Sequence, residues 1–164
     1  AALRTFEEAI LAARSVEVPS ELAIADLQRS YTDVLLYNGD LADAEETINA
    51  AIEYYERDVE LHRAPLASSL GRQAEALFLS DRMTEALGVA ERALELGVDG
   101  ATESNSYVEH LVGVILAGDG QCTEGLAMFL DDSVLFGAES RTNPQWQRLK
   151  PHIENAREQC GGAQ

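Results

Sequence analysis

The sequence has little positive charge and no long apolar run, and each shortage excludes a class of protein. Its 12 Lys and Arg residues stand against 29 Asp and Glu residues, which gives a formal net charge of −17. Binding to a nucleic-acid backbone needs clustered positive charge, so we expect no nucleic-acid partner. No apolar stretch approaches the roughly 18 residues that a membrane helix needs, so we expect no insertion into a membrane.

The motifs of metal sites and enzymes are also missing from the sequence. The residues His62, His110 and His152 are widely spaced, and none stands in an HxxxH or HExxH pattern. There is no GxSxG motif, no Gly-rich phosphate loop and no EF-hand loop. Adjacent carboxylates such as Glu45 and Glu46 do not face each other on a helix. We therefore expect no metal, no cofactor and no enzymatic activity.

The sequence does contain a helical pattern along most of its length. Apolar residues recur at spacings of three and four, as in Leu27, Tyr31, Val34 and Leu35. No stretch shows the alternation of a β-strand. The 164 residues are the length of about one domain, so we expect a single all-α domain.

Three segments of the chain resemble one another. Each has the end of a helix, a short turn rich in Gly, Asn, Asp or Ser, an apolar residue and then a small residue. These segments are residues 31–44, 73–86 and 112–125, with the small residues Ala44, Ala86 and Gly125. A fourth, shorter copy around Ala9 has no helix before it. The spacing predicts a row of antiparallel helix pairs.

The small and apolar positions of these copies resemble the tetratricopeptide repeat family. The matching positions are Thr32 and Leu35, Ala74 and Leu77, and Gly113 and Leu116 in the first helices, and Ala44, Ile48 and Ala51, Ala86, Ala90 and Ala93, and Gly125 and Phe129 in the second helices. The copies are spaced more widely than the 34 residues of that family. The resemblance implies a right-handed α-solenoid of antiparallel helical hairpins, which contains no catalytic site.

This architecture divides the chain into one domain, residues 1–164. We expect a half repeat at 1–18, hairpins at 20–63, 65–98 and 102–137, and a C-terminal capping helix at 144–160. The cap begins at Asn143-Pro144, and Trp146 is its large apolar anchor. Because the chain opens on a half repeat, we expect it to be a region of a longer bacterial protein.

The two cysteines, Cys122 and Cys160, allow two interpretations. If a helix from Cys122 to about Asp132 packs antiparallel to the cap, Cys160 returns to the neighbourhood of Cys122. A disulfide would then pin the cap and indicate an oxidising, extracytoplasmic compartment. Two unpaired cysteines would be equally compatible with a cytoplasmic location.

The resemblance also predicts a binding surface, because the first helices of such hairpins line the concave face of the solenoid. The residues expected on this face are Asp26, Arg29, Asp33, Tyr37, Ser68, Glu75, Phe78, Tyr107 and His110. Acidic and aromatic side chains together suit a peptide with basic and apolar side chains. The peptide-binding variant that holds a C-terminal carboxylate uses Lys and Asn, where this chain has Asp33 and Gly71, so that activity is not transferred.

We therefore expect a non-catalytic, monomeric protein–protein interaction module that binds a peptide or helix of a partner in a concave acidic groove. One alternative is a structural spacer or self-association unit of a signalling protein, such as a kinase or transcription regulator, with no ligand of its own. Another is a small-molecule pocket between hairpins.

Overall fold

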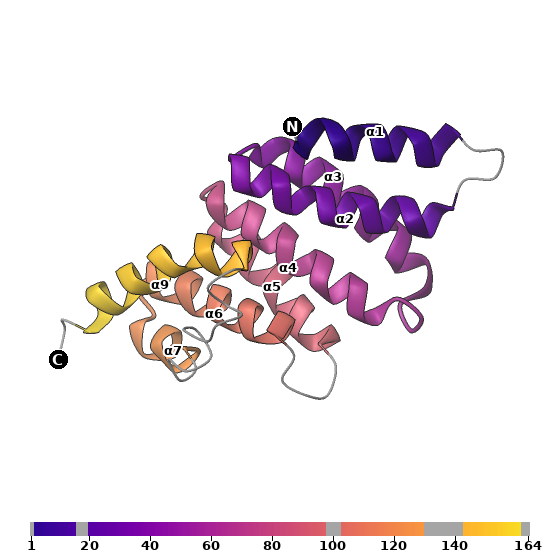
Figure 1. Cartoon of the computed structure of the whole chain (residues 1–164). Helices are drawn as coiled ribbons and strands as arrows, with labels where there is room; N and C mark the ends of the chain where they lie inside the picture. The colour runs from indigo at the N-terminus through magenta and orange to yellow at the C-terminus, as the bar shows by residue number, and fades with distance from the viewer. Residues whose placement is uncertain (1, 16–19, 98–102, 130–142, 162–164) are drawn as a thin grey trace.

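The computed structural model describes residues 2–15, 20–97, 103–129 and 143–161, and these residues are almost entirely helical (Figure 1). The elements are α1 (Ala2–Ser15), α2 (Glu21–Asn38), α3 (Leu41–Tyr55), a 3-10 turn (Glu56–Asp58), α4 (Arg63–Leu79), α5 (Met83–Leu96), α6 (Glu103–Gly118), α7 (Cys122–Ala127) and α9 (Pro144–Gly161). The described ranges contain no strand. The expected all-α class is confirmed, and none of these helices is long and apolar enough to cross a membrane.

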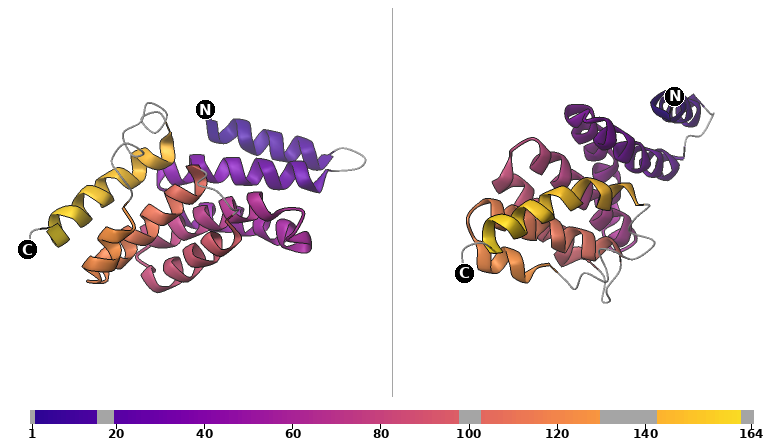
Figure 2. Two further views of the ribbon diagram at one scale, coloured as in Figure 1. Left: turned by 90° about the horizontal axis from the view of Figure 1, so that it is seen from below. Right: turned by 60° about the vertical axis from the view of Figure 1, so that its left-hand side comes forward.

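Consecutive helices pack against each other in antiparallel order. Contacts join α1 to α2, α2 to α3 and so on through α7, with α4 also touching α2 and α6 (Figures 1 and 2). The first helices of successive pairs, α2, α4 and α6, thus lie next to one another.

The turns inside the three pairs repeat one backbone geometry. Each contains a residue with positive φ, namely Gly39 at 81°, Asp81 at 59° and Gly120 at 83°. All three occupy the same position of the three similar sequence segments. In each turn the next N–H donates back into the preceding helix, as Asp40 N–H does to the Leu35 carbonyl at 3.0 Å. This is the Schellman-type bond that ends a helix at a left-handed residue.

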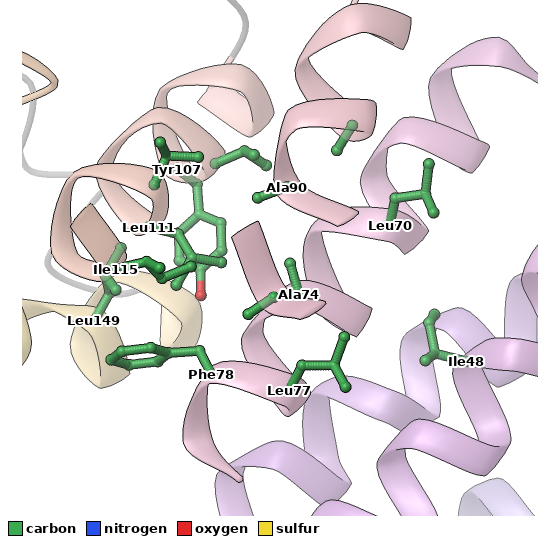
Figure 3. Close-up of a cluster of buried hydrophobic side chains, with 14 of the residues drawn as sticks. Ile48, Leu70, Ala74, Leu77, Phe78, Ala90, Tyr107, Leu111, Ile115 and Leu149 are labelled. Carbon is green, nitrogen blue, oxygen red and sulfur yellow. The ribbon is translucent and has the colours of Figure 1, made fainter. Parts of the chain in front are cut away.

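Small residues permit close helix packing within each pair. Ala44 and Ala86 are fully buried, and Gly125 lies directly against α6. A Cβ atom on Gly125 would stand 2.7 Å from the Gly113 carbonyl oxygen, so the two backbones touch. Larger apolar residues fill the remaining core, in which side chains of α4, α6 and α9 gather around Ala74 (Figure 3).

Helix α7 is shorter than the sequence led us to expect. It ends at Ala127, because the N–H groups of Met128 and Phe129 donate to carbonyls only three residues back. Such bonds tighten and close the last turn of a helix. Asp132, the expected end, and the rest of the expected hairpin up to residue 137 lie outside the described residues.

Helix α9 contacts α2 and α6 as well as α7, the described helix that precedes it in the chain. It runs beside α6, with its start near α2 and its end at α7 (Figures 1 and 2). Its buried face consists of Trp146, Leu149, Ile153, Ala156 and Cys160. This helix therefore crosses the side of the molecule that α2, α4 and α6 present together.

Candidate functional site

The candidate site is the surface of α2, α4 and α6 on which α9 lies, which we call the inner face. Its polar and aromatic members are Asp33 of α2, Ser68, Arg72, Glu75 and Phe78 of α4, and Tyr107 and His110 of α6. Helix α9 adds Trp146, Arg148 and His152. Four helices thus contribute to one cluster.

An ion pair between α9 and α4 lies at the centre of this cluster. Arg148 Nε donates to Glu75 Oε1 at 2.6 Å and Arg148 Nη2 donates to Glu75 Oε2 at 3.0 Å. Glu75 is only 2% exposed. Burial acts to lower the pKa of Arg148, but the hydrogen bonds and charge of Glu75 outweigh it and the pKa is raised. The bidentate geometry compensates a charge pair that has lost most of its water.

A second ion pair extends the cluster to α2. Arg72 donates to both carboxylate oxygens of Asp33, at 2.7 and 3.1 Å, and to the Ser68 hydroxyl oxygen at 2.6 Å. Asp33 Oδ1 is also 3.8 Å from Arg148 Nη2. Acidic and basic groups therefore alternate across the inner face and connect α2, α4 and α9.

Aromatic rings form the other half of the contact. Trp146 packs edge-on against Tyr107, with 5.6 Å between the ring centroids, and against His110 at 5.1 Å. Further along α9, His152 packs edge-on against Phe78 at 5.0 Å. Edge-to-face pairs at these distances contribute beyond the area that they bury.

Two polar groups beneath Trp146 are poorly satisfied. His110 is fully buried, and its Nδ1 donates to the Ser106 carbonyl at 2.6 Å, whereas its Nε2 has no partner among the described residues. Burial lowers the pKa of His110, which keeps the ring neutral. The Tyr107 hydroxyl is also buried without a hydrogen bond of good geometry; burial and the nearby Glu75 carboxylate raise its pKa well above 10. Each unsatisfied buried group costs about 1–3 kcal/mol.

A disulfide holds the far end of α9. Cys160 in its last turn is bonded to Cys122 at the start of α7, with 5.2 Å between the Cα atoms. The structure therefore has the bridged alternative of the two that the sequence left open. Around the bridge, Ala117 and Ala156 form a small apolar cluster with Leu126 and Phe129.

The structure distributes the nine residues expected in the groove unequally. Five of them contact α9, namely Asp33, Glu75, Phe78, Tyr107 and His110, and Ser68 is joined to this group through its hydrogen bond with Arg72. Asp26 instead accepts the Tyr55 hydroxyl at 2.7 Å, and Arg29 lies 3.6 Å from Asp26. Tyr37 is 67% exposed. The inner face also differs from an open groove, since α9 covers its acidic and aromatic centre.

Sequence reasoning missed Arg72 and Arg148 and gave Trp146 only an anchoring role. The two arginines carried a signal, because a basic residue on the apolar face of a helix must find an acidic partner when that face is buried. Arg72 stands between Leu70 and Ala74, and Arg148 stands between Trp146 and Leu149. What the sequence could not supply is the partner on another helix.

A half-open cleft remains where α9 passes the ends of α4 and α6. Its volume is about 350 Å³, and Phe78, Met83 and Val114 lie opposite Asn155 and Gln159 of α9. It is not an enclosed cavity of the kind that the small-molecule alternative needs. Across the described parts of the chain, no three His, Cys, Asp or Glu side chains are grouped to hold a metal ion.

Comparisons of this chain with models of protein families, with curated proteins and with solved structures return no match. The geometry of the inner face is therefore the basis for assigning a function. That geometry is a set of buried acids and aromatic rings that contact one helix.

Proposed function

We propose that this chain is a non-catalytic protein-interaction module, a tetratricopeptide-like α-solenoid. Its inner face binds a helical segment of a partner that carries basic and apolar side chains. The observation that carries this proposal is the contact between α9 and the inner face. In this contact Arg148 pairs with buried Glu75, and Trp146 packs on Tyr107 and His110. The chain thus uses its own inner face to hold a helix of this chemistry.

The charges of the chain support the same partner class. Helix α9 has three basic residues, Arg148, Lys150 and Arg157, and two acidic ones, Glu154 and Glu158, for a net charge of +1. The whole chain carries −17, so the rest of the molecule is strongly acidic. Such a field speeds the approach of a basic segment and disfavours an acidic one.

The repeated turn geometry supports a solenoid. Gly39, Asp81 and Gly120 end the first helix of three successive pairs with the same backbone bend. Equal turns stack helix pairs in the same orientation, and the first helices then share one face. The Cys122–Cys160 bridge supports an oxidising compartment for this form of the chain.

The test requires an inner face that α9 has vacated. In a loosened variant, Trp146→Ala and Arg148→Ala are combined with Cys122→Ser and Cys160→Ser, so that α9 loses its main contacts and its disulfide while the inner face keeps its residues. A fluorescent peptide of residues 143–161, with Cys160→Ser, is titrated with this variant and followed by anisotropy. We expect saturable binding, and binding at least about tenfold weaker for the peptide with Arg148→Glu, since a reversed charge then faces Glu75.

Matched variants of the module make the test specific to the inner face. Adding Glu75→Gln to the loosened variant removes the charge that the peptide meets, whereas adding Glu91→Gln makes the same change on the exposed side of α5. Weaker binding with Glu75→Gln and unchanged binding with Glu91→Gln supports the proposal. The proposal is contradicted if neither substitution changes the binding. It is also contradicted if the peptide does not bind while circular dichroism shows intact helices.

A second candidate function is a structural spacer or self-association unit without a ligand. The observation that favours it is that Asp33 and Glu75 already have partners within the chain. Light scattering over a range of concentrations distinguishes the two functions. The average mass of a self-associating chain rises with concentration, whereas that of the binding module stays the mass of a monomer.

A further inference from the structure

We propose that α9 occupies the place of the partner helix, and that the Cys122–Cys160 disulfide determines whether a partner can replace it. In the oxidised chain α9 remains on the inner face. In the reduced chain α9 exchanges with a partner helix of the same chemistry. This inference rests on the proposed function and adds that the redox state of the disulfide controls access to the inner face.

The two ends of α9 are held in different ways. Its first turns contact the inner face through the Arg148–Glu75 pair and the Trp146 ring. Its last turns are held by the small apolar cluster around Ala156, by the Arg157 guanidinium 5.6 Å from the centre of the Phe129 ring, and by the bond between Cys160 and Cys122. Among these attachments the disulfide is the one that a reductant can open.

The cluster under Trp146 is imperfectly matched to α9. His110 Nε2 is buried with no partner among the described residues, and the Tyr107 hydroxyl has no hydrogen bond of good geometry. A buried polar group without a partner destabilises the arrangement that buries it. A partner helix that donates a hydrogen bond to His110 Nε2 therefore has an advantage over α9.

The residues of α9 that touch the inner face define the partner. They are an aromatic residue, a basic residue two positions later, and apolar residues three and seven positions after the aromatic, as in Trp146, Arg148, Leu149 and Ile153. This spacing places Trp146, Leu149 and Ile153 on one face of a helix, with Arg148 at the edge of that face. The occupant is therefore an amphipathic helix with an aromatic anchor and a basic residue for Glu75.

The disulfide favours α9 over a partner helix on the inner face because it closes a loop of the chain. Cys122 and Cys160 are 38 positions apart, so the bond restricts where an undocked α9 can go. Loop closure of this size favours the docked form by a factor on the order of 100. A free helix must overcome this factor to displace α9 from the oxidised chain.

A dithiol reductant supplies the two electrons that open the bond. One thiolate of the reductant attacks the Cys122 sulfur, which is partly exposed, and the Cys160 thiolate leaves. The second thiol of the reductant then attacks the mixed disulfide and releases Cys122. The reductant ends as a disulfide, and its two protons end on the Cys122 and Cys160 thiols.

The experiment compares the oxidised full chain, the chain reduced with dithiothreitol, and the Cys122→Ser/Cys160→Ser variant. The probe is the fluorescent 143–161 peptide with Cys160→Ser, and its dissociation constant is measured by anisotropy. We expect the reduced chain to bind on the order of 100-fold more tightly than the oxidised chain. The double variant should bind like the reduced chain whether or not dithiothreitol is present.

Hydrogen exchange tests the same inference without a peptide or a substitution. The amides of α9 should exchange faster in the reduced chain, whereas those of α4 should be unchanged. Equal exchange of α9 in both forms overturns the inference. So does equal peptide binding by the oxidised and reduced chains.

Failure of this inference is distinct from failure of the proposed function. If the loosened variant binds the peptide but reduction changes nothing, the inner face binds helices and the disulfide does not control it. If the loosened variant does not bind, the proposed function fails as well. If the reduced chain instead dimerises and excludes the peptide, the exchanging helix is α9 of a second copy and the assignment of a partner protein is wrong.

Discussion

Arg148 donates two hydrogen bonds to the carboxylate of Glu75, although the two residues are 73 positions apart in the chain. Both groups are largely removed from water, so neither can lose the other without leaving a buried charge. This pair joins the last helix to the middle of the helical row. It therefore governs stability as well as the occupancy of the inner face.

Arg148→Met leaves the Glu75 carboxylate unpaired beneath α9. We expect the free energy of unfolding to fall by about 3–5 kcal/mol, because breaking a buried pair on one side exposes the full cost of the remaining charge. The free energy of unfolding of the double variant Glu75→Met/Arg148→Met should fall much less, since no unpaired charge remains buried. Urea denaturation followed by circular dichroism measures both values.

Lys150→Met provides the control for this pair. Lys150 lies 3.7 Å from Glu154 with both side chains more than half exposed, so its loss should change stability by less than about 0.5 kcal/mol. If the double variant is as unstable as Arg148→Met alone, the side chains serve as packing and the charge argument is wrong.

Gly125→Ala tests the contact between the α6 and α7 backbones. The new Cβ would stand 2.7 Å from the Gly113 carbonyl oxygen and 2.8 Å from the Ala117 nitrogen. Neither backbone atom can move aside without shifting a helix, so we expect destabilisation by about 1–3 kcal/mol. Thermal denaturation of the oxidised chain measures it.

Gly88→Ala makes the same change where there is open space. Its Cβ would meet nothing within 4 Å, and it lies inside the helix α5. Since Ala favours a helix over Gly, we expect a gain of up to about 1 kcal/mol. Equal effects at Gly125 and Gly88 would mean that helix propensity, and not the close approach of α6 and α7, determines the outcome.

Two equivalent turn positions should respond with opposite signs. Gly39 has a φ of 81°, so Gly39→Ala forces an alanine into the left-handed region and should cost about 1 kcal/mol. Asp81 already bears that cost at 59°, so Asp81→Gly should be neutral or stabilising. Urea denaturation of both variants checks the signs, and a stabilising Gly39→Ala would rule out a shared turn geometry.

The sequence predicted the helical pairs because their signals are local. Apolar spacing determines which face of each helix is buried, and a Gly or Asp in the turn reverses the chain. The position of α9 depends on contacts such as that of Arg148 with Glu75, which no local pattern encodes. The resemblance to helical repeats predicted which helices form the inner face but did not predict that α9 covers it.

The length of α7 shows the same limit at the level of a single helix. Apolar residues continue past Ala127, and the bridged interpretation of the two cysteines assumed a helix to about Asp132. The bonds of Met128 and Phe129 to carbonyls three residues back end it earlier. Helix ends are decided by such small differences in backbone hydrogen bonding, which residue spacing does not report.

His110 should make the stability of the chain depend on pH. Burial lowers the pKa of His110 below its usual 6.5, and the positive charge of Arg157 acts in the same direction, whereas the Ser106 carbonyl and Glu109 oppose it. Between 6.5 and the lowered value, the unfolded chain binds a proton that the folded chain does not. The free energy of unfolding should therefore fall as the pH drops below about 6.5, by at most about 1.4 kcal/mol per pH unit from this residue.

His110→Gln isolates this effect from the titration of the carboxylates. Urea denaturation at pH 7.5 and pH 5.5 gives the loss of stability on acidification for the wild-type chain and for the variant. Because Gln does not titrate, the variant should lose less stability than the wild-type chain over this interval, even if it is less stable at both pH values. Equal losses would mean that His110 is protonated in the folded chain as readily as in the unfolded one. That result would be incompatible with a neutral ring packed between Trp146 and Phe129.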